Sequence, residues 1–223
     1  MALDIFSARH QMQGCLQSTI VPAGFLLGLD TLGECMRDDD VRAFFGHALL
    51  HEIMPCVDLP KNELEPLTMA LCREMEGPLS RQALLSFTQN GVRAWAAQAL
   101  PMIRAYEEKH FSLPPCLCFG LSALIMFFAG ARKNQEGKFE GIRQEEKYPL
   151  EESEETLSAF ARLSCDMPPE MLAYAVLSDQ DIWEEDLRSI QGLEDMIASQ
   201  LQDLQLIGLR SAMKNAWKKE EKA

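Results

Sequence analysis

The sequence lacks a hydrophobic run long enough to cross a bilayer, and it lacks an excess of positive charge. Its longest apolar run covers residues 116–129 and contains Gly120 and Ser122, whereas a membrane-spanning helix needs roughly 20 apolar residues. The 21 basic side chains are outnumbered by 34 acidic ones, which gives a net charge of −13. Because this charge repels phosphate backbones and anionic lipids, we expect neither nucleic acid nor a membrane as a partner.

The first residues lack the features of an export signal. Residues 1–9 include Asp4 and have no basic segment followed by an apolar one, so we expect a cytoplasmic protein. The seven cysteines are odd in number. Together with the missing signal, this predicts reduced thiols that pack as small core residues and no disulfide framework.

The glycine-rich motifs that bind nucleotides are also missing. Neither G-x-G-x-x-G nor G-x-x-x-x-G-K-[ST] occurs, and the cluster of Gly24, Gly28 and Gly33 has the wrong spacing and lies in an apolar helical stretch. We interpret these glycines as close-packing positions. The sequence therefore predicts no cofactor bound by the residues of this chain.

Strands are scarce, and helical periodicity dominates instead. Apolar residues recur at steps of three and four, which is typical of helices packed on one face. We therefore predict an all-α fold, a single multi-helix domain over residues 1–223. Residues 131–155, rich in Lys, Glu, Gln and Gly, are expected to form an exposed connection with room for a short hairpin. The expected helices cover 40–54, 62–76, 79–88, 90–109 (divided at Pro101), a central 116–129, and segments beginning at 153 and 168. An apolar stripe predicts one long C-terminal helix that ends in a solvated run over 218–222; its residues are Leu193, Ile197, Leu201, Leu204 and Gly208.

Several residue pairs have spacings that could carry chemistry. His47 and His51 share a helix face, as two metal ligands would, but Glu52 follows the second histidine and no third ligand is implied. We predict an exposed histidine pair and no metal site. Cys116 and Cys118 point apart on an apolar helix, so core packing is the better interpretation.

Two further groups of residues are also interpreted as structural. The carboxylates between Glu145 and Glu155 form a solvated stretch, because catalytic carboxylates need burial to separate their pKa values. Trp95, Trp183 and Trp217 are interpreted as packing residues.

Several segments together resemble one known family. They are TIVPAGFLLGLDTL at 19–32, EIMPCVDLP at 52–60, FGLSALIMFFAG at 119–130 and IWEEDL at 182–187, together with LP at 100–101 and LPP at 113–115. In order and spacing they resemble the C-terminal domain of the mannitol dehydrogenase family, and within it the tagaturonate reductase, or altronate oxidoreductase, branch. The resemblance runs from about residue 9 to 217.

The resemblance implies a mostly helical substrate domain, similar to the C-terminal domain of 6-phosphogluconate dehydrogenase. In the family this domain follows a Rossmann domain that holds NAD. This chain shows no counterpart of that half, so NAD is implied by the family only, and a separately encoded Rossmann-domain subunit is one conceivable partner. Without such a partner a hydride-transfer domain cannot hold the reagent that does the chemistry.

The family's catalytic motif is a lysine, an asparagine five residues later and a histidine three further on. Placed by Val21 and Pro22, these positions fall on Arg9, Gly14 and Gln17. Arginine stays protonated and cannot act as a general base, glycine offers no side-chain donor, and glutamine does not titrate. The resemblance therefore implies that this chain has no catalytic residues.

The family's substrate-contacting lysine and arginine fall on Ala94 and Gln98, whereas Asn90 keeps a residue type that the family uses. The candidate substrate-binding residues are thus Arg9, Gln17, Asn90 and Gln98, which could bind the carboxylate and hydroxyls of a hexuronate or a polyol.

Three functions stay open at this point. The first is a substrate-domain homologue that is inactive alone, the second is the substrate half of a split NAD-dependent hexuronate reductase, and the third is a non-catalytic sugar-acid-binding module. The second requires an exposed apolar docking face, expected around Ala23, Phe25 and Leu26.

Overall fold

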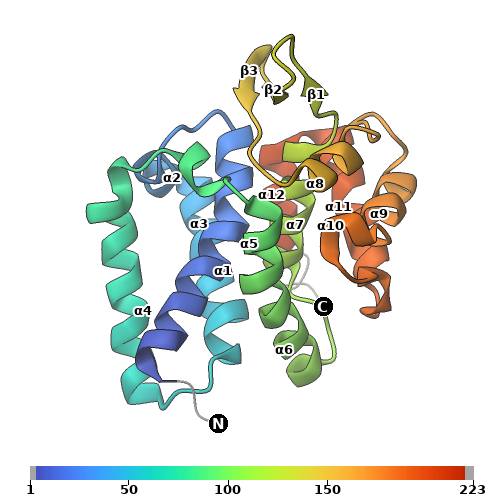
Figure 1. Ribbon diagram of the computed structural model, residues 1–223. Helices are drawn as coiled ribbons and strands as arrows, with labels where there is room; N and C mark the ends of the chain where they lie inside the picture. Colours follow the sequence, from blue (N-terminus) through green and yellow to red (C-terminus); the bar gives the residue numbers. More distant parts are fainter. Residues whose placement is uncertain (1–3, 219–223) are drawn as a thin grey trace.

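The computed structural model describes residues 4–218, and its helices pack around one central helix, α7 (Pro115–Phe128) (Figure 1). All but one of the side chains of α7 are buried. The longest helix, α1 (Ile5–Leu26), packs directly against it. Gly120 permits this contact, because a Cβ there would lie 2.7 Å from the Cα of Thr19. The predicted all-α fold and its central helix are confirmed.

The N-terminal half adds α2 (Leu32–Arg37), α3 (Asp39–His47) and α4 (Lys61–Glu76). Asp38 caps α3 by accepting from the backbone N–H groups of Asp40 and Val41. The helix expected over 40–54 does not continue regularly after α3. Ala48–Ile53 form a wider π-helical turn (η1), and Met54–Cys56 form a 3-10 turn (η2) that contains Pro55.

The helix predicted over residues 79–88 is wrong. This segment consists of two 3-10 turns, Pro78–Arg81 (η3) and Leu84–Phe87 (η4), separated by extended backbone. The extended part pairs with the chain at Thr31: Leu32 N donates to Gln82 O at 3.2 Å, and Leu84 N donates to Asp30 O at 2.8 Å. This long-range pairing satisfies backbone groups that a local helix would otherwise have satisfied.

The segment 90–109 is divided into two helices, α5 (Gly91–Gln98) and α6 (Leu100–His110). The break falls at Ala99, just before Pro101. A proline there cannot donate a helical hydrogen bond, so it occupies the first turn of α6.

Residues 131–155 begin with a small antiparallel sheet in the order β1-β2-β3, at the top of Figure 1. Its strands are β1 (Arg132–Lys133), β2 (Phe139–Arg143) and β3 (Glu146–Pro149), and Gly141 faces Tyr148 across β2 and β3. Tyr148 is buried and its hydroxyl donates to the carbonyl of Phe127 at 2.6 Å. The sheet is therefore anchored to the C-terminal end of α7.

The C-terminal part consists of short helices followed by a helix pair. The short elements are α8 (Glu154–Phe160), α9 (Pro169–Leu177), α10 (Gln180–Trp183) and the 3-10 turn η5 (Leu187–Ser189). The single long C-terminal helix that the stripe from Leu193 predicts is wrong. Gly208, with φ 78°, separates α11 (Leu193–Ile207) from α12 (Leu209–Lys218). The solvated run expected over 218–222 lies outside the described residues beyond Lys218.

The structure bears on three further expectations, which concern a membrane span, the cysteines and the tryptophans. Over residues 4–218, the structure has no helix that is both long and apolar enough to cross a membrane. All seven cysteines are free thiols, and Cys116 and Cys118 are fully buried, as the core interpretation requires. Trp95 is buried against Trp183, with ring centroids 5.2 Å apart.

Candidate functional site

The first candidate positions lie on α1, which runs between α4 and α5 in Figure 1. Arg9 and Gln17 are both half-buried. The Nη2 of Arg9 donates to Oε1 of Glu74 on α4 at 2.5 Å, and this hydrogen bond raises the pKa of the guanidinium. Arg9 is thus held cationic and tied to a carboxylate, which is the opposite of what a general base requires.

Gly14 lies against the side chain of Gln98, which ends α5. A Cβ built at Gly14 would lie 2.8 Å from both Cγ and Cδ of Gln98, so the glutamine side chain fills the space that a side chain at position 14 would use. These are two of the positions at which the resemblance places family site residues. The structure therefore brings positions 14 and 98 together, and the uncharged amide side chain of Gln98 packs against the backbone of α1 at Gly14.

Asn90 lies at the other end of α5. It has a left-handed backbone with φ 51°, and its N–H donates to the carbonyl of Glu151 at 2.9 Å. Eight residues of helix separate it from Gln98, a rise of about 12 Å. Asn90 is therefore far from the Gly14–Gln98 contact.

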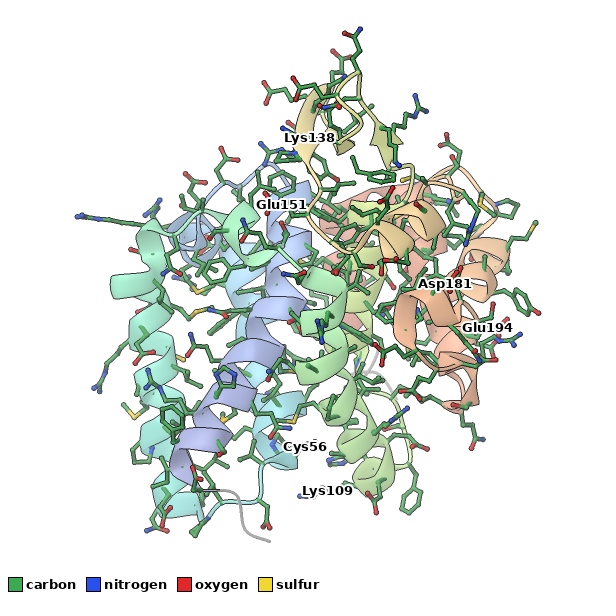
Figure 2. All side chains as sticks on the ribbon, in the orientation of Figure 1. Cys56, Lys109, Lys138, Glu151, Asp181 and Glu194 are labelled. Atoms are coloured by element: carbon green, nitrogen blue, oxygen red, sulfur yellow. The ribbon has the colours of Figure 1, made fainter. Side chains whose placement is uncertain are left out.

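Asn90 borders a cavity of about 620 Å³ between α5, α8 and α10. Arg9, Gln17 and Gln98 are not among its lining residues. Glu152 at its edge accepts from the backbone N–H of Val92 at 3.0 Å and so caps α5. The cavity carries one guanidinium, that of Arg93, against three carboxylates. A sugar acid would meet net repulsion here; the acidic lining residues are Glu152, Asp181 (labelled in Figure 2) and Glu184.

Sequence reasoning missed Glu74 and Glu152, the carboxylates that contact this region. Glu74 is an ordinary acidic residue late in α4, and Glu152 belongs to the stretch interpreted as solvated. Glu152 makes a defined structural contact even though that stretch is mostly exposed. A local pattern could not have indicated either partner, because each contacts residues about 60 positions away in the sequence.

The expected docking face around Ala23, Phe25 and Leu26 is not exposed. Ala23 and Phe25 are 1% and 2% exposed. The guanidinium of Arg143 lies 4.1 Å above the ring of Phe25, and the ring of Tyr148 packs edge-on at 4.9 Å. The sheet therefore covers the apolar end of α1, and the prediction of an open patch there is wrong.

The described residues do not form a Rossmann-type site for NAD, the cofactor that the family implies. A dinucleotide site needs a parallel strand, a glycine-rich turn and a helix N-terminus that receives the pyrophosphate. In the described part of the chain the one sheet has three short antiparallel strands. Gly24 and Gly33 pack against Cys35 and Ser80 instead, since a Cβ at either would come within 2.8 Å of them.

The histidine pair is less exposed than predicted. The rings of His47 and His51 lie 4.7 Å apart on one face, and His47 also stacks on Trp217 of α12 at 5.2 Å. His51 is exposed, as predicted, whereas His47 is half-buried. The sequence implied no third metal-binding side chain, but the structure places Glu52 and Cys116 beside His47.

The class of protein that this fold defines is an all-helical domain with one small antiparallel sheet. Residues 15–205 match the model of the mannitol dehydrogenase C-terminal domain, and the chain belongs to that family. Altronate oxidoreductase of Klebsiella pneumoniae (strain 342) is 34% identical over 201 residues, which are 88% of this chain and 39% of the relative. The altronate oxidoreductase of Cronobacter sakazakii is 35% identical over the same shares of both chains.

Solved structures show the same fold. The ternary complex of Pseudomonas fluorescens mannitol 2-dehydrogenase with NAD and D-mannitol superposes with a TM-score of 0.76 at 13% identity, covering 97% of this chain and 42% of that one. Substrate-free D-sorbitol dehydrogenase gives a TM-score of 0.67 at 13% identity, covering 92% of this chain and 40% of that one. The chain thus spans about two fifths of the length of the relatives it matches, and it is a member of an oxidoreductase family.

Proposed function

We propose that this chain is a substrate-domain homologue of an altronate oxidoreductase whose own residues do not supply acid–base catalysis, so that it is inactive by itself. The observation that carries this proposal is the contact between Gly14 and Gln98. At the position where a family member presents an amide toward a developing alkoxide, this chain has no side chain, and its neighbour packs into the space.

The ion pair of Arg9 and Glu74 supports the same conclusion. A base that accepts the proton of a sugar hydroxyl needs a pKa that can fall toward neutrality. Glu74 moves the pKa of Arg9 further in the wrong direction. The third position, Gln17, has an amide that can hydrogen-bond a hydroxyl but cannot transfer its proton at neutral pH.

The test is a turnover assay of the purified chain with NADH and tagaturonate. Klebsiella altronate oxidoreductase is the positive control. The expected result is no NADH oxidation above the rate of buffer, in the chain and in an Arg9→Ala/Gln17→Ala variant alike. A rate that scales with the purified chain and disappears in the variant would overturn the proposal, whereas an equal rate in both would identify a contaminant.

A second candidate function, binding of a sugar acid without turnover, is favoured by the position of Arg9 and Gln17. They lie two helical turns apart on α1, and the side chain of Arg9 is 40% exposed. Glu74 competes with a ligand carboxylate for the guanidinium. Glu74→Gln should therefore tighten the binding of tagaturonate, fructuronate or altronate in calorimetry. The absence of heat in both proteins with all three sugar acids would eliminate this function.

The third possibility is a split enzyme in which a nucleotide-binding subunit completes the site. It is supported by the relatives, of which this domain makes up about two fifths. Such a subunit would have to dock elsewhere than on Phe25, which the sheet covers. Co-purification of a nucleotide-binding protein with the chain, together with NADH-dependent turnover by the complex, would establish this function. A chain that elutes as a strict monomer from its native lysate would argue against it.

A further inference from the structure

His47, Glu52 and Cys116 bring three kinds of metal-binding atom to one place. An imidazole nitrogen, a carboxylate oxygen and a thiol sulfur all lie within 4.8 Å of one another. They come from α3, from the π-helical turn η1 and from the first turn of α7. Glu52 and Cys116 are fully buried, and His47 is half-buried.

The wide turn explains why Glu52 joins His47. In a regular α-helix the residue four positions after His47, which is His51, shares its face, and the fifth is turned away. A π-helical turn closes hydrogen bonds between residues five apart, as in the bond from Met54 N–H to the carbonyl of Leu49. Residues five apart then lie on one face, so Glu52 comes beside His47. Such turns are frequent at functional sites.

The carboxylate of Glu52 is fixed by the helix that carries Cys116. Its Oε1 accepts from Cys116 N at 2.8 Å, and its Oε2 accepts from Leu117 N at 2.9 Å. Hydrogen bonds of this kind orient metal ligands and strengthen metal binding.

The ring of His47 is positioned by one aromatic neighbour in α12 and one in η1. It lies 5.2 Å from Trp217 in a stacked arrangement and 4.7 Å from His51. Stacking restricts rotation of the imidazole. The ring of His47 therefore loses little conformational entropy when it binds a cation. His51 is exposed and is not one of the three clustered ligand residues.

We propose that His47, Glu52 and Cys116 form a binding site for a thiophilic divalent cation of the Zn²⁺ type. Sulfur and nitrogen donors exclude Mg²⁺ and Ca²⁺, which take oxygen ligands. A carboxylate and a thiolate together carry two negative charges, so the buried site is neutral once the cation is bound. Zn–S bonds are about 2.3 Å and Zn–N or Zn–O bonds about 2.0 Å long, so the three donor atoms, which lie within 4.8 Å of one another, move closer together when they bind one cation.

Binding has a defined proton balance. The Cys116 thiol loses its proton to solvent as the sulfur–metal bond forms, because only the thiolate is a ligand. One thiol is among the three ligands, so we expect binding to release one thiol proton.

The experiment is a titration of the chelator-treated, reduced chain with Co²⁺, a coloured substitute for Zn²⁺. We expect one Co²⁺ per chain, a thiolate-to-metal charge-transfer band and displacement of Co²⁺ by Zn²⁺. Cys116→Ala should abolish the band, and His47→Gln should weaken binding by about tenfold or more. The matched control is Cys118→Ala, an equally buried thiol on the same helix, which should keep both the band and the stoichiometry.

Three results would overturn the proposal. They are a folded wild-type chain that takes up no Co²⁺, a charge-transfer band that persists in Cys116→Ala, and a loss of binding in Cys118→Ala equal to that in Cys116→Ala. Far-UV circular dichroism checks folding of each variant. If Cys116→Ala does not fold, His47→Gln decides the question, because its side chain is only half-buried. Binding at wild-type affinity in His47→Gln would then refute the site.

Discussion

Replacing Glu52 by glutamine should destabilise the protein strongly, although the substitution keeps the size and shape of the side chain. Glu52 is fully buried, and its two oxygens accept from the N–H groups of Cys116 and Leu117 in the first turn of α7. Pro114 and Pro115 have no N–H group, so the carboxylate satisfies the two N–H donors of this helix start that have no helical partner. It also places a negative charge at the positive end of the central helix.

The magnitude follows from these contacts. An amide oxygen can still accept from one N–H, but the amide nitrogen cannot accept from the other, and a buried unsatisfied N–H costs about 1–3 kcal/mol. Loss of the charge at the helix terminus costs about a further 1 kcal/mol. The neutral glutamine side chain costs less free energy to bury than a carboxylate, and this difference offsets part of the destabilisation. We expect a net loss of about 2–3 kcal/mol in the free energy of unfolding.

The assay is urea denaturation followed by circular dichroism, with a metal chelator present so that cation binding does not contribute. Glu155→Gln is the matched control, because Glu155 lies in the first turn of α8 and is exposed. We expect the control to change the free energy of unfolding by less than about 0.5 kcal/mol. A Glu52→Gln protein that is as stable as the control would refute the capping role assigned to this carboxylate.

Three further predictions use the same denaturation assay. Arg210 donates two hydrogen bonds to Asp38 and so holds the pKa of that carboxyl below its usual value. Its contribution is complete above about pH 4 and is lost as the pH falls through the lowered pKa, so Asp38→Asn should flatten the acid side of the stability profile; a profile parallel to wild type would contradict this. Gly120→Ala should cost about 2 kcal/mol, since the added Cβ would meet the backbone of Thr19; an unchanged midpoint would rule out the close helix approach. Tyr148→Phe should cost about 1 kcal/mol through the lost bond to the Phe127 carbonyl, and no loss would show that this bond does not anchor the sheet.

Local signals predicted some elements of the fold correctly and failed where distant segments compete. The central helix was predictable because its side chains are apolar on all sides, as a helix surrounded by others requires. Residues 79–88 were mispredicted because their backbone pairs with Thr31, some 50 positions earlier. The long C-terminal helix was mispredicted because a single glycine, Gly208, changes the chain direction without interrupting the apolar stripe.

The candidate site was only partly predictable for a similar reason. Comparison of motifs identified Arg9, Gly14, Gln17 and Gln98 as replaced positions, but it gave no indication of their neighbours. The structure pairs Arg9 with Glu74 and packs Gln98 against Gly14. Neither contact leaves a signal in the sequence, because ionic and packing partners on separate helices have no fixed spacing.

The sequence by itself determined the helical class, the family and the identity of the residues at the family's catalytic positions. These are properties of composition, periodicity and residue type, which a linear chain carries directly. Only the tertiary structure decided that His47, Glu52 and Cys116 meet, because their meeting depends on a π-helical turn and on helix α7, whose first turn lies more than 60 residues away in the sequence. The π-helical turn is stabilised by contacts of Glu52 with α7, and these contacts exist only in the folded chain.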